Sequence, residues 1–319
     1  MKVLFVASGN HGAVSPVVGN QAEALNTEGV EIEWYLLKGK GIKGYLRNVK
    51  PLRQYINTHP YDAIHAHYSL SAFVASLAGA KPLVVSLMGS DVKAAGWYKF
   101  VIRFFAWLFR WKAIIVKSND MYRDLGIKRA IVIPNGVNME RFKPLDKSDC
   151  LKQLGWDSTK KHILFPANAS RPEKDYPLAE TAVERARELV SEGVELHAFE
   201  NTPNTETPYW YNAADVVLMT SKWEGSPNVI KEAMACARPI VSTNVGDIAE
   251  RLNGVEGCYA VEVKECLVSE CLAKALIEAM EYSKTKGREK IISDGLDTRE
   301  INRKLVDVYR GMYKNFDKR

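Results

Sequence analysis

The chain has 319 residues, of which 46% are hydrophobic and 26% charged, and this length exceeds what one hydrophobic core usually holds, so two domains are expected. The composition is that of a globular protein without low-complexity or repeated segments, which excludes disordered and solenoid classes, and the net charge of +6 gives no reason to expect a nucleic-acid partner. Five scattered cysteines without a CxxC pair argue against a disulfide framework or a zinc–thiolate site and fit a reducing cytoplasm.

The first half of the chain alternates strand and helix patterns. Its beginning, MKVLFVASG, is too short an apolar run for a signal peptide and predicts a first strand. Helices are expected at Gln21–Glu28 and Tyr45–Asn57. Such alternation is typical of βαβ units with a parallel sheet, and no run of about 18 apolar residues predicts a transmembrane helix. The expected strands are Val3–Ala7, Glu31–Leu37, Ala63–Ala66, Leu83–Leu87, Ala113–Val116 and Ala130–Ile133.

The second half repeats this alternation after a polar, proline-containing stretch, Pro144–Asp149, which we interpret as a linker. We therefore predict an N-terminal domain at 1–145, a C-terminal domain at 146–300, and a helix at 301–319 that crosses back to the N-terminal domain. Ligands of doubly wound α/β sheets bind beyond the carboxyl ends of strands, so a central cleft between the two domains is the expected site. The expected strands are His162–Pro166, Glu195–Phe199, Val216–Met219 and Pro239–Thr243; the expected helices are Ala179–Glu192, Pro227–Ala237 and most of Cys266–Lys318.

The segment SKWEGSPNVIKE predicts a helix that begins directly after a turn. Gly225 permits the turn, Ser226 is a good N-cap, and Pro227 suits the first helical position. The free amides of Asn228 and Val229 would then point out of the helix N-terminus, which carries about half a positive charge. This end is therefore a candidate site for a phosphate group.

Two carboxylates flank this helix start. Glu224 lies before the helix, and Glu232 lies about one and a half turns into it. A carboxylate accepts two hydroxyl hydrogen bonds, which suits the vicinal diols of sugars. Taken alone, the same pattern more often describes a capped surface helix with a solvated glutamate.

The longer text around these glutamates resembles the signature of the family 4 retaining glycosyltransferases, which have the GT-B fold of two Rossmann-like domains facing a cleft. The chain reads EGSPNVIKEAMACARPIVSTNVG from Glu224 to Gly246, preceded by AADVVLMTS. Three further segments, YDAIHAHYSLSAF, SLMGSDV and IPNGVNMERFKP, resemble the family's strand-end histidine motif, acceptor-side turn and domain-closing segment. The resemblance covers nearly the whole chain.

The resemblance implies roles for the donor-side residues. Glu224 would hold the transferred sugar and Glu232 the ribose, while Lys174, which follows Pro-Glu, would hold the diphosphate. Outside the motif, Lys174 would be interpreted as an exposed loop lysine. The family's usual arginine is replaced here by Ala169, and Arg171 is the candidate substitute. The segment FENTPNTETPYWY lacks the family's glycine-rich stretch, so the resemblance does not specify the base.

On the acceptor side, the resemblance implies that His67 contacts the sugar. His65 is expected to be buried in its strand, and a satisfied core histidine is the alternative for His67. Asp91 is either a helix N-cap or an acceptor ligand. The loop after the first strand should face the acceptor and phosphates, and it is not a GxGxxG dinucleotide motif. It contains Gly9, Asn10, His11 and Gly12.

The segment Ala94–Trp111, AAGWYKFVIRFFAWLFRW, predicts a helix with aromatic and cationic character. Such a segment can lie in the interface of an anionic bilayer. The alternative is a helix packed into the N-terminal domain with its cations exposed. The membrane interpretation would imply a lipid-linked acceptor.

We therefore expect a metal-independent glycosyltransferase that uses a UDP- or GDP-linked sugar, retains anomeric configuration and builds cell-surface polysaccharide or glycolipid. No Asp-x-Asp motif occurs, so no metal and no cofactor are expected. The expected location is the cytoplasm, at the inner face of the cell membrane. Alternatives are a non-catalytic GT-B subunit that supports a partner transferase, and an epimerase or phosphorylase on the same architecture.

Overall fold

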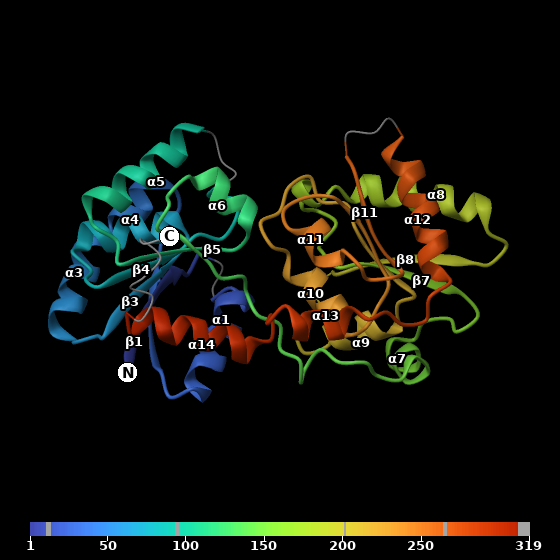
Figure 1. Ribbon diagram of the computed structural model, residues 1–319, viewed down its shortest axis with the longest axis horizontal. Coiled ribbons are helices and arrows are strands. Elements are labelled where there is room, and N and C mark those ends of the chain that lie inside the picture. Colours follow the sequence, from blue (N-terminus) through green and yellow to red (C-terminus); the bar gives the residue numbers. More distant parts are fainter. Residues whose placement is uncertain (11–13, 93–95, 201, 264–266, 312–319) are drawn as a thin grey trace. The chain divides into compact units, whose positions relative to one another are not determined.

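The computed structural model describes residues 1–10, 14–92, 96–200, 202–263 and 267–311, and its chain divides into two compact units (Figure 1). The first unit comprises Met1–Gly136 and the chain from Thr298 onward, and the second comprises Val137–Asp297. Each unit has its own sheet and hydrophobic core. Within the described ranges, no helix combines the length and apolar character that a bilayer crossing requires.

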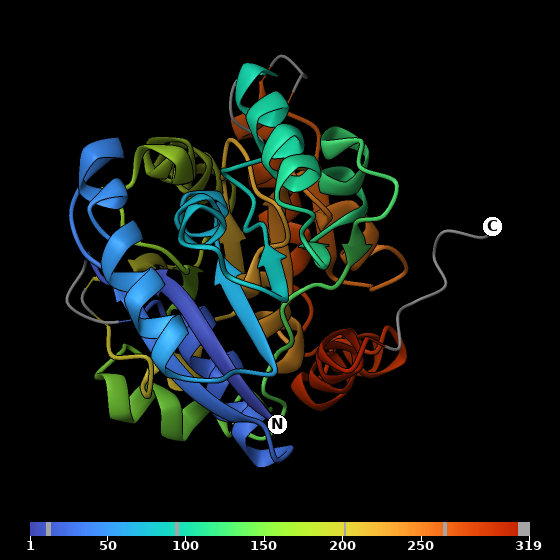
Figure 2. The same cartoon turned by 90° about the vertical axis from the view of Figure 1, so that its left-hand side faces the viewer.

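The sheet of the first unit has six strands in the order β2-β1-β3-β4-β5-β6, and every neighbouring pair is parallel (Figure 2). The strand segments expected from the sequence are confirmed, with ends that differ by at most one residue. The central strands are buried almost throughout, because helices cover both faces of a parallel sheet. The strands are β1 (Lys2–Ser8), β2 (Glu31–Leu37), β3 (Ala63–His67), β4 (Leu83–Ser86), β5 (Ala113–Val116) and β6 (Ile131–Val132).

One helix expected in this unit is two helices. The segment expected as a single helix at Tyr45–Asn57 is divided into α2 and α3, because Asn48 fixes the chain between them. Its Nδ2 donates to the carbonyls of Gly44 at 2.8 Å and Lys38 at 2.9 Å. The helices of the unit are α1 (Pro16–Thr27), α2 (Gly41–Leu46), α3 (Val49–Thr58), α4 (Ser69–Ala78), α5 (Gly96–Leu108), α6 (Asn119–Leu125) and α14 (Thr298–Tyr309).

The last of these helices returns to the first unit from the far end of the sequence. Helix α14 packs against α1. Its Tyr309 hydroxyl lies 2.6 Å from Nδ1 of His65 in β3. The helix α14 therefore packs on the unit in which the chain began.

The second unit contains a five-stranded parallel sheet in the order β11-β10-β9-β7-β8. Four strands lie where the sequence predicted them, and β11 was missed. The strands are β7 (Lys161–Phe165), β8 (Val194–Ala198), β9 (Val216–Met219), β10 (Ile240–Thr243) and β11 (Cys258–Val261). The helical elements are α7 (Lys147–Leu154), η1 (Pro172–Lys174), α8 (Tyr176–Leu189), α9 (Thr207–Ala213), α10 (Asn228–Ala235), α11 (Ile248–Leu252), α12 (Val268–Met280) and α13 (Gly287–Ser293).

The segment interpreted as a linker, Pro144–Asp149, is instead the approach to α7 and its first turn. Asp146 caps this helix by accepting a hydrogen bond from the Asp149 amide at 3.0 Å. The passage between units lies earlier, after Gly136.

Residues 137–145 belong to the second unit because side chains of that unit bind their backbone. Asn212 accepts from the amide of Leu145 and donates to the carbonyl of Lys143. Arg288 donates to the carbonyls of Met139 and Phe142. These bonds link positions far apart in the sequence.

Both sheets contain a position where the strand order reverses, and such switch points are where doubly wound sheets bind ligands. In the first unit the reversal lies between β1 and β3. In the second it lies between β7 and β9. The segments that follow these four strands therefore define where a functional site is expected.

Candidate active site

The loops that follow β7 and β9 bring Lys174 and Glu224 together. Lys174 ends η1, which follows β7, and Glu224 lies in the loop between β9 and α10. The two side chains form an ion pair and are only 11% and 17% exposed. Ser221 also donates to Oε1 of Glu224 at 2.9 Å. Two residues that lie 50 positions apart in the sequence are thus partners at one switch point.

The backbone around Lys174 is fixed from the β9 side. The Thr220 hydroxyl, at the end of β9, lies 3.0 Å from the carbonyl oxygen of Lys174 and 2.8 Å from that of Asp175. Asp175 adopts a left-handed conformation with φ of 53°, which turns the chain into α8. The ammonium of Lys174 therefore projects from a backbone that Thr220 holds in place.

The loop of Glu224 rests on a glycine from the next part of the motif. Gly246 has φ of +65°, and a Cβ there would lie 2.7 Å from the Gly225 oxygen and 2.9 Å from that of Glu224. Only a residue without a side chain allows this approach. The last glycine of the sequence motif thus sets the position of its first glutamate.

Helix α10 begins one residue later than the sequence predicted. Pro227 occupies the N-cap position with an extended ψ of 127°, and Ser226 is not the cap. The Ser226 hydroxyl instead accepts a hydrogen bond from Nζ of Lys231 at 3.2 Å. Asn228 and Val229 form the first turn, where backbone amides have no partner within the helix. The expected helix N-terminus is therefore present, with a different cap.

The second glutamate of the motif is held by a tyrosine that the sequence did not identify. The Tyr211 hydroxyl, from α9, donates to Oε2 of Glu232 at 2.8 Å. Burial raises the pKa of Glu232, and the hydrogen bond from Tyr211 partly opposes this shift. The signal available in the sequence was the aromatic run at the end of FENTPNTETPYWY.

Lys231 is a further residue that the sequence analysis missed. Its side chain is buried beneath the loop between β9 and α10, and desolvation lowers the pKa of Lys231 to about 8. The charge of Asp247 favours the ammonium form and opposes that shift. Because Lys231 directly precedes Glu232, its place within the motif was the only available signal.

Arg171, the predicted substitute for the family's arginine, does not join Lys174. Its guanidinium is largely exposed and binds the carboxylate of Glu173, with Nε at 2.8 Å. The guanidinium of Arg171 is thus paired with a residue two positions along the chain. No contact in the described structure supports a shared role of Arg171 and Lys174.

In the first unit, His67 ends β3 at the switch point beside β1. Its ring is buried, and neither ring nitrogen has a hydrogen-bond partner among the described residues. Burial and, to a smaller extent, the charge of Lys117 lower the pKa of His67 to about 3, so the imidazole is neutral at physiological pH. His65, two residues earlier, is satisfied by Ser86 at 2.8 Å and by Tyr309. The burial expected for His65 is confirmed, and the contact of His67 with a sugar stays a prediction.

Asp91 is held by backbone amides of two segments, one of which is the start of helix α4. Its carboxylate is fully buried and accepts hydrogen bonds from the amides of Met88, Gly89, Val92 and Ser69 at 3.0–3.2 Å. It therefore fixes the turn after β4 and the start of α4. An acceptor ligand would need an accessible carboxylate, which this residue does not offer.

The loop after β1 is only partly described. Gly9 donates its amide to the Leu37 carbonyl at 2.8 Å, and Asn10 exchanges two hydrogen bonds with the backbone of Gly39. These contacts tie the loop to the end of β2. His11 and Gly12, also predicted here, lie outside the described residues.

Helix α5 presents an aromatic surface to solvent. Its exposed side chains follow helical spacing, whereas Ile102 and Ala106 face the core. The predicted helix continued to Trp111, but the helix ends at Leu108, and Trp111 is buried with its indole donating to Ser76 at 2.8 Å. We call the exposed set the α5 aromatic stripe; it consists of Trp97, Phe100, Phe104, Trp107 and Leu108.

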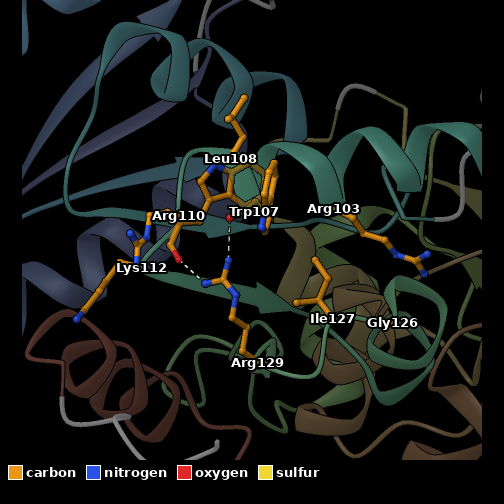
Figure 3. Close-up of a pocket in the computed structure, with 10 residues that line it drawn as sticks. Arg103, Trp107, Leu108, Arg110, Lys112, Gly126, Ile127 and Arg129 are labelled. Atoms are coloured by element: carbon orange, nitrogen blue, oxygen red, sulfur yellow. Dashed lines mark hydrogen bonds between the residues drawn. The ribbon is translucent and has the colours of Figure 1, made fainter.

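An open pocket of about 900 Å³ lies beside this stripe (Figure 3). Trp107 forms part of its wall, and four cationic side chains line it. Arg129 is fixed there by hydrogen bonds to the carbonyls of Trp111 and Ala106. The cationic residues of this basic pocket are Arg103, Arg110, Lys112 and Arg129.

Comparison with known proteins identifies the class to which this fold and these loops belong. A model described as "Glycosyltransferase Family 4" matches residues 13–141, and one described as "Glycosyl transferases group 1" matches residues 172–282. The chain belongs to the family 4, group 1 glycosyltransferases, and its two Rossmann-like units have the GT-B fold of that family.

Individual relatives are distant. A lipopolysaccharide core biosynthesis mannosyltransferase of Rhizobium meliloti is 26% identical over 198 residues, 54% of each chain. The chain spans about half the length of the curated relatives it matches. Among solved structures, sucrose-phosphate synthase from Thermosynechococcus elongatus is similar with a TM-score of 0.80 and 16% identity, covering 98% of this chain and 99% of that one. Anabaena HepE in complex with UDP is similar with a TM-score of 0.73 and 19% identity, covering 97% and 100%.

Proposed function

We propose that this chain transfers a sugar from a UDP- or GDP-linked donor to a glycan or lipid-linked acceptor during synthesis of a cell-surface glycan. The observation that carries this proposal is the shielded ion pair of Lys174 and Glu224 at the β7/β9 switch point. The presence of UDP in the similar HepE structure and the lipopolysaccharide role of the Rhizobium relative support the donor class and the glycan class.

The donor's diphosphate would bind between Lys174 and the first turn of α10. An ammonium has three N–H donors, so Lys174 can bind a phosphate oxygen while it also binds Glu224. The amides of Asn228 and Val229 add partial positive charge where the leaving diphosphate gains negative charge. Preorganised donors of this kind stabilise a developing anion, so the proposed reaction needs no metal.

The two glutamates would hold hydroxyl groups of the donor. Glu224 would accept a hydrogen bond from a hydroxyl group of the transferred sugar, since it lies in the loop just before the first turn of α10. Glu232 would accept from the ribose, with Tyr211 fixing its other oxygen. On the acceptor side, His67 is neutral, and its ring can accept or donate a hydrogen bond to a hydroxyl.

We propose that the anomeric configuration is retained. The sequence lacks a carboxylate pair of the glycosidase kind, and the leaving phosphate can itself accept the acceptor's proton on the same face of the sugar. NMR analysis of the product's anomeric proton tests this. A product of inverted configuration would overturn it.

Substitution of Lys174 tests the donor site. Lys174→Met should lower kcat by about a hundredfold or more, the scale for removing one stabiliser of developing charge. Lys222→Met is the matched control, because Lys222 lies in the loop that follows β9 but is half exposed and pairs with Asp175 at 3.5 Å. Equal turnover of the two variants would refute the role of Lys174. Donor binding by the purified wild-type chain without turnover would favour a non-catalytic subunit.

We further propose that the α5 aromatic stripe and the basic pocket dock the protein on an anionic membrane surface at the inner face of the cell membrane. Trp97, Phe100 and Trp107 are each about 70% exposed, which leaves their apolar area available to insert. Aromatic side chains favour the interface, and the four cations of the pocket match acidic headgroups. A protein docked in this way would reach a lipid-linked acceptor in the same membrane.

Vesicle flotation tests the membrane proposal. The protein should float with phosphatidylglycerol vesicles and not with phosphatidylcholine vesicles, and added salt should weaken the binding. The double variant Trp97→Ser/Trp107→Ser should abolish flotation. Leu189→Ser/Ile292→Ser, which removes two similarly exposed apolar side chains elsewhere, should not. Flotation that is independent of the stripe or of acidic lipid would overturn the proposal.

A further inference from the structure

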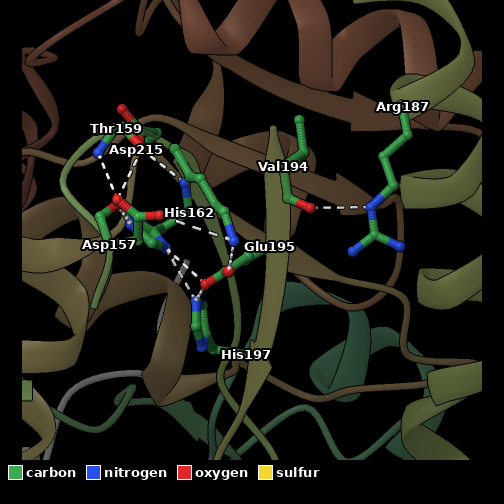
Figure 4. A network of polar contacts seen from close by, with 9 residues as sticks. Asp157, Thr159, His162, Arg187, Val194, Glu195, His197 and Asp215 are labelled. Carbon is green, nitrogen blue, oxygen red and sulfur yellow. Dashed lines mark hydrogen bonds and ion pairs between the residues drawn. The ribbon is translucent and has the colours of Figure 1, made fainter. Parts of the chain in front are cut away.

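Two histidines and a glutamate gather on one face of strands β7 and β8, where neither the family motifs nor the proposed reaction uses them (Figure 4). Parallel pairing places His162 of β7 beside Glu195 of β8. His197 follows Glu195 by two residues and so projects to the same face. The sequence separates His162 from this pair by more than thirty positions, and the strand register brings them together.

The distances among the three side chains suit a shared cation. Nδ1 of His162 lies 3.0 Å from Nε2 of His197. Oε2 of Glu195 lies 3.8 Å from the first nitrogen and 3.6 Å from the second. Ligand atoms at about 2.0–2.1 Å from a tetrahedral zinc ion are separated by roughly 3.3 Å. The observed separations lie on both sides of that value, so small side-chain rotations would complete the geometry.

A backbone contact orients the most buried ligand. Nε2 of His162 lies 2.9 Å from the carbonyl oxygen of Asp157, which makes Nε2 the protonated nitrogen. The lone pair of Nδ1 therefore faces Glu195 and His197. Histidines that bind metals characteristically donate their other N–H to a carbonyl or carboxylate in this way.

The surroundings leave one side of the cluster open. His162 is fully buried, whereas the side chains of His197 and Glu195 are 17% and 34% exposed. The indole of Trp156 stacks on His197 with ring centroids 3.6 Å apart. Lys160 binds the other oxygen of Glu195 at 2.5 Å, so its ammonium competes with a cation for that carboxylate.

We propose that His162, Glu195 and His197 bind a divalent transition metal of the zinc type, with a fourth coordination position open to solvent. Two imidazole nitrogens and one carboxylate oxygen form a ligand set that suits this class of ion. The ion would link β7 to the edge strand β8. His162 is the second residue of β7, whereas the Lys174 loop follows the carboxyl end of that strand, so this site is separate from the proposed transfer chemistry.

Zinc titration of tag-free, chelator-treated protein tests the proposal without any activity assay. Isothermal titration with competing chelator should give one Zn²⁺ per chain, and the thermal midpoint of unfolding should rise with Zn²⁺. His197→Ala and Glu195→Gln should each weaken binding at least tenfold. His59→Ala, which removes an exposed histidine of the first unit, should leave it unchanged.

Two further measurements identify the ligands. Co²⁺ in place of Zn²⁺ should give the intense visible bands of a tetrahedral site, and these should be absent in His197→Ala. Lys160→Met should tighten Zn²⁺ binding severalfold, because it removes the ammonium that competes for Glu195. Equal zinc affinity in wild type and His197→Ala, no binding at micromolar Zn²⁺, or weaker binding by Lys160→Met would each overturn the proposal.

Discussion

The substitution Gly246→Ala tests whether the fit between the end of the motif and the Glu224 loop sets the geometry of the site. Gly246 has φ of +65°, and an added Cβ would lie 2.7 Å from the Gly225 oxygen and 2.9 Å from the Glu224 oxygen. Both of these atoms belong to backbone and cannot rotate away. The loop that carries Glu224 must therefore move.

The size of the effect follows from these distances. A left-handed conformation costs a non-glycine residue about 1–2 kcal/mol. Restoring an ordinary contact of 3.4 Å requires the loop to retreat by about 0.5–0.7 Å, and overpacking of this kind adds about 1–3 kcal/mol. We expect the free energy of unfolding to fall by about 2–5 kcal/mol. Because a misplacement of about 1 Å can reduce turnover a hundredfold, kcat should fall by about tenfold or more.

Gly254→Ala is the matched control in the same unit. Gly254 has φ of +74°, but nothing lies within 4 Å of its added Cβ. This variant should lose only the conformational part, about 1–2 kcal/mol, and keep its turnover. Urea unfolding and donor turnover of both variants provide the comparison. If the two variants lose equal stability, or if Gly246→Ala keeps full turnover, the steric argument is refuted.

Three further predictions concern buried polar groups. Tyr211→Phe removes the hydroxyl that donates to Glu232, so the free energy of unfolding measured in urea should fall by about 1–3 kcal/mol. Calorimetry should also show weaker nucleotide binding by this variant. No change in either quantity would contradict the role of Tyr211. Burial lowers the pKa of Lys231 to about 8 from 10.5, so the unfolded chain binds more protons between these pH values and wild-type stability should rise there relative to Lys231→Met. The pKa of His67 falls from 6.5 to about 3 on folding, so its contribution to stability is complete above pH 6.5 and is lost as pH falls toward 3. Wild type should therefore lose up to about 1.4 kcal/mol per pH unit more than His67→Gln in that range, and parallel stability curves would contradict the shift.

The order of the strands followed from local patterns in the sequence. Buried parallel strands appear as short β-branched runs, and such runs located ten of the eleven strands in the described part of the chain. For segments with weaker patterns the prediction was wrong. Strand β11, with its partly exposed CYAV, was missed, and the polar stretch before α7 was mistaken for a linker. Strand β11 forms through its pairing with β10, whereas the start of α7 carries a local cap, Asp146, that the sequence analysis did not recognise.

The candidate site was predictable where one continuous motif contains it. Glu224, Glu232 and the start of α10 lie within a single stretch of sequence, and the family resemblance added Lys174. The sequence did not identify Tyr211 as the partner of Glu232, nor the burial of Lys231, because each depends on how α9 and the β9–α10 loop pack. Asp91 was expected as a helix N-cap or an acceptor ligand, and the sequence did not show that it would accept from four backbone amides, including that of Ser69 at the start of α4.

The sequence by itself determined the two α/β units, the family and the motif residues, since periodicity and contiguous motifs are local properties of a chain. The tertiary structure alone decided which residues meet across strands and turns. His162, Glu195 and His197 become neighbours only through the register of β7 and β8, and the Lys174–Glu224 pair forms only because β7 and β9 are adjacent. Strand order and register depend on packing of the whole sheet, which no short segment encodes.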